Sequence, residues 1–152
     1  MSVQAKNDLT ALLDLFIENE LLFAEYYGEC ARIFPEKSHN FDTLARHEKI
    51  HAAIFEKIKR SVIENPDKWS KGDFHISVLK IVVEDVKEKI SQLKEGKLKK
   101  DFIISYAADL EKSLIEKNFF RALKTSIKEF EIFFEKLQNE TANHQKLLEG
   151  LA

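Results

Sequence analysis

Apolar residues recur every three or four positions through most of the chain, which is the spacing of a helix with one buried face. The pattern predicts five helices, over about 7–33, 35–65, 74–95, 101–123 and 126–150. The chain contains neither a long alternation of apolar and polar residues nor the hairpin dipeptide Asn-Gly, so it shows no clear strand signal. The sequence therefore predicts an all-α protein.

The predicted boundaries rest on residues that start or stop helices. Pro35 suits the first position of the second helix, and Asp73 is a candidate N-cap for the third. Gly96 should end the third helix. Ser126 and Glu129 have the spacing of a capping box, which places the start of the last helix at Ser126.

Polar side chains interrupt the apolar faces of four predicted helices near their middles. The interrupting residues are Glu20 in the first helix, Glu48 and His51 in the second, Glu111 in the fourth, and Thr141 and His144 in the last. An isolated polar residue on such a face is usually a hydrogen-bonded core group. The repetition in four helices is what indicates a shared site.

The interruptions should lie at the same height in two antiparallel hairpins. Both helices of a hairpin rise ~1.5 Å per residue, so residues equally far from the turn lie at one level. Phe34, beside Pro35, is midway between Glu20 and Glu48. Ser126 is midway between Glu111 and Thr141 in the same way. Two hairpins packed face to face would therefore collect three carboxylates and two imidazoles in one layer.

Such a layer needs positive charge. Two carboxylates about 4 Å apart repel by about 4 kcal/mol at an effective dielectric constant of 20. The predicted apolar faces contain no lysine or arginine that could neutralise them. A bound cation would do so, and oxygen and imidazole ligands without thiolates favour iron or manganese, with zinc as another candidate.

Four segments resemble the ferritin-like superfamily, in particular rubrerythrin-like domains. They are ELLFAEYY (20–27), LARHEKIHAAIFEKI (44–58), AADLEKSLIEKNFF (107–120) and NETANHQKLL (139–148). The resemblance implies a single domain over residues 1–152, built as an antiparallel four-helix bundle of two hairpins. It also implies a helical crossover between the second and third helices of the bundle, for which the stretch from about 66 to 100 is long enough.

The resemblance also implies roles for the interrupting residues at a centre of one or two iron ions. Glu20 and Glu111 would each bind one ion at the ends of the site, and Glu48 would bridge the two ions. His51 and His144 would each bind one ion. The implied activity is redox chemistry with dioxygen, peroxide or ferrous iron, as a rubrerythrin-like peroxidase or a ferroxidase.

Two features depart from the family. Thr141 stands where the family has its second bridging glutamate, and the adjacent Glu140 points ~100° away around the helix. Glu140 bending inward, a single metal ion, and a site that has lost its metals are three readings of this difference. The chain has one cysteine, so it lacks the four-cysteine rubredoxin iron site, and its electrons would come from a separate protein.

Three further residues near the expected ligands are candidates for supporting roles. Tyr27 follows Glu20 by seven residues and is either an oxidisable neighbour of the metals or a core aromatic residue. Thr141 would face the site without binding metal as the missing glutamate would. His47 completes a literal H-E-x-x-H with Glu48 and His51, the signature of zinc proteases.

Two other functions compete with the iron site. A zinc hydrolase would use His47 and His51 as ligands and Glu48 as general base, but it leaves Glu20, Glu111 and His144 unexplained. A metal-free helical bundle that binds other proteins would fill the same layer with Glu–His hydrogen bonds. Loss of the bridging glutamate makes this second alternative credible.

Composition and charge limit the expected partners and location of the protein. The formal net charge of −2 over 152 residues gives no reason to expect nucleic acid as a partner. No apolar run approaches the ~18 residues that span a membrane, and the first residues do not resemble a signal peptide. We therefore expect a cytoplasmic protein. The apolar face of the crossover helix should pack on the bundle or against a second copy in a homodimer.

Overall fold

Five α-helices make up most of the residues that the structure describes, which are 1–112 and 121–151 of this computed structural model. The helices are α1 (Val3–Ile33), α2 (Ser38–Glu64), α3 (Ile76–Lys94), α4 (Lys100–Lys112) and α6 (Lys128–Leu151). The chain is thus mainly helical, as its sequence predicts. Two short strands are the exception, β1 (Trp69–Lys71) and β2 (Leu123–Thr125).

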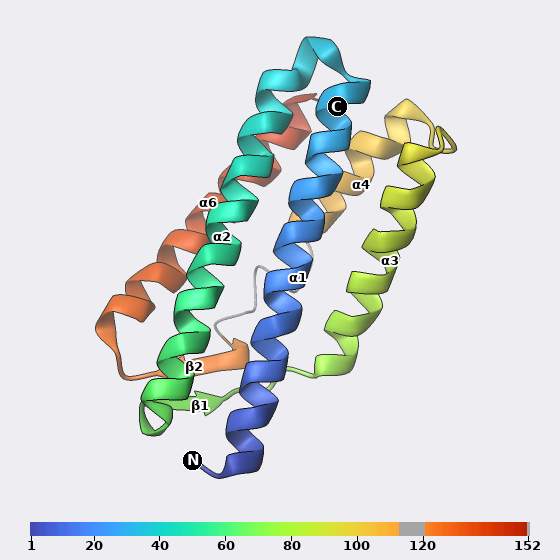
Figure 1. The fold of residues 1–152 in the computed structure, drawn as a ribbon. Helices are drawn as coiled ribbons and strands as arrows, with labels where there is room; N and C mark the ends of the chain where they lie inside the picture. The colour runs from blue at the N-terminus through green and yellow to red at the C-terminus, as the bar shows by residue number, and fades with distance from the viewer. Residues whose placement is uncertain (113–120, 152) are drawn as a thin grey trace.

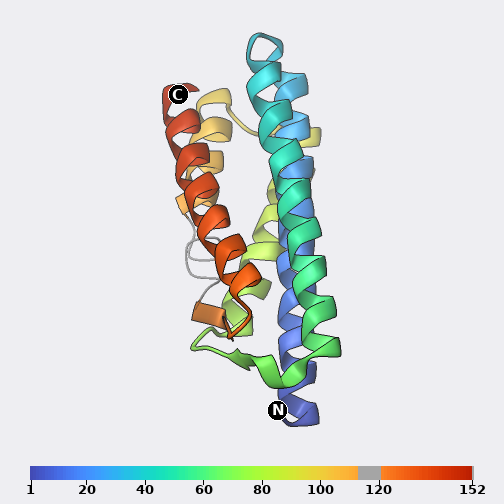
Figure 2. The ribbon, with the colours of Figure 1, turned by 90° about the vertical axis from the view of Figure 1, so that its left-hand side faces the viewer.

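The helices form two antiparallel pairs with a fifth helix beside one of them. Figure 1 shows α1 and α2 running in opposite directions along most of their length, and α3 lying alongside α1. Figure 2 shows the α4–α6 pair facing the α1–α2 pair as a second layer. The antiparallel pairing of the expected hairpins is therefore present in the structure.

The turn between α1 and α2 lies where the sequence places it. Phe34 ends α1, and Pro35–Lys37 form a short 3-10 turn closed by the hydrogen bond from Lys37 N to Phe34 O, at 2.9 Å. Pro35 therefore opens this turn and not α2 itself, so the predicted start of the second helix is three residues early. At the other end, Ser2 Oγ accepts from Ala5 N and caps α1 at Val3, ahead of the predicted start.

The starts of α3 and α6 also differ from prediction. His75, and not Asp73, occupies the N-cap position of α3. α6 begins at Lys128, so Ser126 does not cap it. Instead Thr125 Oγ1 accepts from Ile127 N at 3.1 Å in the turn before the helix. The predicted stop at Gly96 is confirmed, because α3 ends at Lys94 and Gly96 has a φ of 71°, which favours glycine.

The two strands correct the prediction that the fourth helix extends to Leu123. β1 pairs antiparallel with β2, so that Trp69 lies opposite Thr125 and Lys71 opposite Leu123. Residues 113–120 of that predicted helix lie outside the described residues. Gly72 continues the contact, because its N donates to Ala122 O and a Cβ there would lie 1.4 Å from Arg121 O. Three-residue strands are too short to produce a readable alternation.

A layer of buried polar side chains separates two apolar clusters in the described structure. One cluster includes Leu13, Phe16 and Phe55, and the other includes Phe23, Phe41 and Leu44. These residues lie on either side of Glu20 in α1 and of Glu48 and His51 in α2. The apolar clusters hold the helices together and keep the polar layer dry. None of the described helices combines the length and apolar character that crossing a membrane requires.

Candidate metal centre

The structure brings together the five residues that the sequence singles out as metal ligands. α1 supplies Glu20, α2 supplies Glu48 and His51, α4 supplies Glu111, and α6 supplies His144. Every one of them is at most 3% exposed. The expectation that these side chains converge in one buried layer is therefore confirmed.

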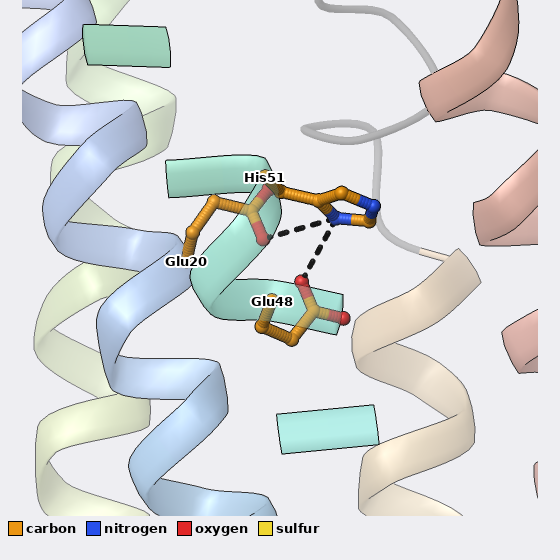
Figure 3. A group of neighbouring side chains, drawn as sticks. All are labelled: Glu20, Glu48 and His51. Carbon is orange, nitrogen blue, oxygen red and sulfur yellow. Dashed lines mark hydrogen bonds and ion pairs between the residues drawn. The ribbon is translucent and has the colours of Figure 1, made fainter. Parts of the chain in front are cut away.

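Glu20, Glu48 and His51 form the first of two triads. His51 Nδ1 lies 3.2 Å from Glu48 Oε2 and 3.6 Å from Glu20 Oε2. Figure 3 shows the two carboxylates, from neighbouring helices, directed at the same ring nitrogen. The three ligand atoms all lie within 4.8 Å of one another, which is close enough for one ion to contact all of them.

Glu48, Glu111 and His144 form the second triad, which has the same composition. His144 Nδ1 lies 3.2 Å from Glu48 Oε1 and 3.4 Å from Glu111 Oε1. These ligand atoms also fall within 4.8 Å of one another. Each triad thus offers two carboxylate oxygens and one imidazole nitrogen.

Glu48 belongs to both triads and uses a different oxygen in each. Oε2 faces His51 of the first triad, and Oε1 faces His144 of the second. The Glu48 side chain is fully buried, so neither oxygen can turn to water. A carboxylate placed in this way can contact one ion with each oxygen.

The pKa values in the layer show how strongly these groups interact. Burial and the adjacent Glu48 carboxylate raise the pKa of Glu20 well above its usual value. Burial would raise the pKa of Glu48 as well, but its close polar contacts with Glu20, His144 and His51 outweigh burial and hold the pKa well below the usual value. Glu48 is therefore the group most firmly kept as a carboxylate.

Both histidines hold a proton more tightly than usual in the absence of a metal ion. Burial alone would lower their pKa values, but the neighbouring glutamates outweigh it. Glu20 and Glu48 raise the pKa of His51 to about 11, and Glu111 and Glu48 raise the pKa of His144 to about 9. The carboxylates of each triad therefore favour a positive charge at the histidine that contacts them.

Buried atoms in both triads form no hydrogen bond of good geometry within the described structure. Among them are Glu20 Oε2, Glu48 Oε1 and His144 Nδ1. Buried polar atoms normally have a partner, and an ion is one explanation where they do not. All three face the interior of a triad, so the donor set fits metal ions.

Tyr27 and Thr141 border the second triad without adding a further carboxylate to it. The Tyr27 hydroxyl donates to Glu111 Oε1 at 2.6 Å and so fixes that side chain. Thr141 is buried, and its hydroxyl donates to Leu137 O at 2.9 Å within its own helix. This buried position on α6 is thus filled by a side chain whose hydroxyl is already bonded to the backbone.

Glu140 and His47 lie outside the triads, against the outer nitrogens of the two histidines. Glu140 Oε2 is 2.6 Å from His51 Nε2. His47 Nδ1 is 2.9 Å from His144 Nε2, with the two rings stacked at 5.1 Å. Glu140 therefore does not bend into either triad, because it contacts the opposite side of His51 from Glu20 and Glu48.

Asn19 is a buried polar residue that the sequence reasoning missed. It precedes Glu20 on α1, is 0% exposed, and neither its amide nitrogen nor its amide oxygen has a hydrogen-bond partner within the described structure. The helical spacing gave no reason to select it, since it lies one position from the predicted buried face. Its amide adds a further buried polar group without a partner to α1.

No known family model, curated protein or solved structure shows a significant match to this chain. The geometry and chemistry of the buried layer are therefore the evidence for function. What the structure establishes is a mainly helical protein with two buried Glu/His triads that could hold metal ions.

Proposed function

We propose that this protein binds two iron ions in a ferritin-like four-helix bundle and performs redox chemistry with dioxygen or peroxide. In this proposal α1, α2, α4 and α6 form the bundle, and α3 belongs to the crossover between its hairpins. The observation that carries the proposal is Glu48, whose two oxygens each face a different imidazole within a different triad.

Each ion would be held by one triad. Glu20 and His51 would bind the first ion, Glu111 and His144 would bind the second, and Glu48 would contact both. The absence of a thiolate from both triads favours iron or manganese over softer metals. Ferrous ions held there would supply one electron each to dioxygen or peroxide.

The residues around the layer would serve this chemistry in distinct ways. The two apolar clusters exclude water from above and below the triads. Tyr27 would hold Glu111 in position through the hydrogen bond from its hydroxyl. The three carboxylates of the triads leave one positive charge on a pair of divalent ions, which favours a small anionic substrate or ligand.

The electrons for repeated turnover would come from a separate protein. The sequence has a single cysteine, Cys30, which is buried in the apolar cluster around Phe34 and Phe41. A four-cysteine iron site cannot be built from it. A peroxidase role therefore requires an external donor, whereas a ferroxidase role takes its electrons from ferrous iron as substrate.

The geometry favours this proposal over a zinc hydrolase. A hydrolase of the H-E-x-x-H type needs His47 and His51 on one ion. In the structure His47 faces His144 Nε2 and belongs to neither triad. Glu48 lies between two imidazoles from different helices, where it can contact two ions.

Metal analysis combined with anaerobic titration of ferrous iron tests the proposal. Protein purified without chelators from iron-supplemented medium should contain transition metal, and the metal-free protein should bind two ferrous ions per chain. Admitting oxygen or peroxide should oxidise the bound iron faster than free iron in the same buffer. A protein that binds no transition metal would be the metal-free interaction module instead.

A further inference from the structure

The two histidines of the centre are oriented alike but have different partners on their outer side. Each directs Nδ1 into its triad, so each directs Nε2 away from it. His51 Nε2 meets the Glu140 carboxylate, and His144 Nε2 meets the His47 imidazole. Each contact joins α2 to α6, but one places an anion behind the histidine and the other a second ring.

The Glu140 contact determines which nitrogen of His51 carries a proton. A carboxylate is only an acceptor, so the 2.6 Å contact requires a hydrogen on His51 Nε2. In the neutral ring, Nδ1 then holds the lone pair that faces Glu20 and Glu48. A cation in the first triad needs this tautomer, because it binds to the Nδ1 lone pair. The negative charge of Glu140 makes Nδ1 more basic and so a stronger metal ligand.

The His47 contact orients His144 without the same charge. If His144 Nε2 donates to His47 Nδ1 at 2.9 Å, Nδ1 of His144 is free to face Glu48 and Glu111. A neutral imidazole accepts this hydrogen bond but adds no negative charge behind the ring. The stacked geometry, with ring centroids 5.1 Å apart, fixes the ring plane all the same.

We propose that Glu140 and His47 are positioning residues that make the two cation positions unequal. The first triad, backed by the Glu140 carboxylate, binds its ion more tightly and fills first. The second triad, backed by His47, binds its ion more weakly and fills second. This inference rests on the proposed two-metal centre and adds to it an order of loading and two residues that set the order.

Titration of the metal-free full-length protein with Co²⁺ tests the order. Heat and the visible absorption of bound cobalt are recorded together, because each triad should give its own spectrum. The unchanged protein should bind two Co²⁺ ions in two resolved steps. Glu140→Ala removes the outer carboxylate and should weaken the first step by about 10–100-fold, while the second step stays within about threefold.

Control variants on the same helices show whether the loss of metal affinity comes from the Glu140 and His47 contacts or from a general change in the helix. Glu140→Gln keeps an oxygen that can accept from His51 but removes the charge, so its loss of affinity should fall between the unchanged protein and Glu140→Ala. Glu135→Gln removes an exposed carboxylate from the same helix and should change neither step. His47→Ala should weaken the second step only, whereas His39→Ala, at an exposed position on α2, should leave both steps unchanged.

The outcomes distinguish this inference from the proposed function. Two cobalt ions bound with equal affinity, or a Glu140→Ala variant that weakens both steps alike, would overturn the unequal positions and leave the two-metal centre standing. A spectrum of the first step that is identical in Glu140→Ala and in the unchanged protein would also overturn it. Failure of the unchanged protein to bind cobalt, manganese or ferrous iron would overturn both proposals together.

Discussion

The two triads contain the same three kinds of ligand but are assembled in different ways. The first is built entirely from α1 and α2, two helices of 31 and 27 residues joined by a short turn. The second needs α2, α4 and α6, which come from distant parts of the chain. One triad is therefore a product of a single hairpin, and the other depends on how the second pair of helices docks onto it.

The residues that contact the ligands from outside also differ between the two triads. The first has the Glu140 carboxylate behind its histidine, and the second has a neutral ring there together with a tyrosine that holds Glu111. Thr141, one helical turn before His144, supplies no carboxylate to the second triad. Equal ligand types thus do not imply equal sites, because the outer contacts determine the charge and the orientation of each ligand.

Replacing the shared residue should have the largest effect, because it damages both triads at once. Glu48→Gln keeps the shape of the side chain but removes its charge, and we expect the loss of both ions. A ligand at 100 times its dissociation constant stabilises a protein by about 2.7 kcal/mol, or about 5–10 °C in the midpoint of thermal unfolding at this size. That metal-dependent rise should disappear in Glu48→Gln and persist in Glu56→Gln, at an exposed position of α2. Unchanged metal content in Glu48→Gln would contradict the bridging role.

Removing one terminal carboxylate should affect one triad only. Glu20→Gln should leave one ion per chain, held by Glu111 and His144, and Glu111→Gln should leave one ion held by Glu20 and His51. Elemental analysis gives the number of ions, and the absorption of bound cobalt shows which position is filled. If each variant gave the same residual spectrum, the two triads would not be separate positions.

Adding a carboxylate beside the second triad should strengthen its metal binding. Thr141→Glu places an acid on the buried face of α6, one turn from His144. We expect the weaker metal-binding step to tighten by about tenfold, and the metal-free protein to lose about 1–3 kcal/mol because another buried polar group lacks a partner. Thr141→Val, of similar shape, should leave both binding steps unchanged. Calorimetric titration measures the first effect, and urea unfolding measures the second.

Raising the pH should change the metal-free protein gradually. The folded-state pKa values of His51 and His144, about 11 and about 9, lie above the unfolded value of 6.5. Their contribution to stability is fully present below pH 6.5 and is lost as the pH rises through 9 and then 11. Thermal unfolding of the metal-free protein should therefore occur at lower temperature at pH 9 than at pH 6.5.

The same change of pH should act in the opposite direction on metal binding. Each imidazole must lose its Nδ1 proton to bind an ion, so affinity should rise with pH over this range. The difference in unfolding temperature between metal-loaded and metal-free protein should widen accordingly. A difference that is constant from pH 6.5 to pH 9 would argue against histidine ligands.

The sequence predicts the helices and the polar layer well because both follow from helical spacing. Glu20 and Glu48 lie on buried faces at matching distances from Phe34, so their convergence could be calculated from the rise per residue, and His51 lies one helical turn beyond Glu48 on the same face of α2. The same calculation placed Glu111 and Thr141 at one level about Ser126, although Ser126 does not cap α6 and the predicted fourth helix does not extend to Leu123, which begins β2. The buried positions of the ligands survive this error because each residue still lies on the buried face of its helix.

The outer contacts could not be predicted in this way. Glu140 lies beside the buried face of α6 and is partly exposed, and its contact with His51 depends on how closely α6 approaches α2. The pairing of His47 with His144 depends on the same approach. The short strands β1 and β2 could not be predicted either, because three residues are too few to show the two-residue alternation of a strand.

A crystal structure of the protein loaded with iron or manganese, with anomalous scattering recorded at the absorption edge of the metal, tests the central claim most directly. The account predicts two anomalous peaks, one on each side of the Glu48 carboxylate, with Glu20 and His51 at one peak and Glu111 and His144 at the other. A single peak between His47 and His51, or no peak in the layer of a fully loaded sample, would contradict it.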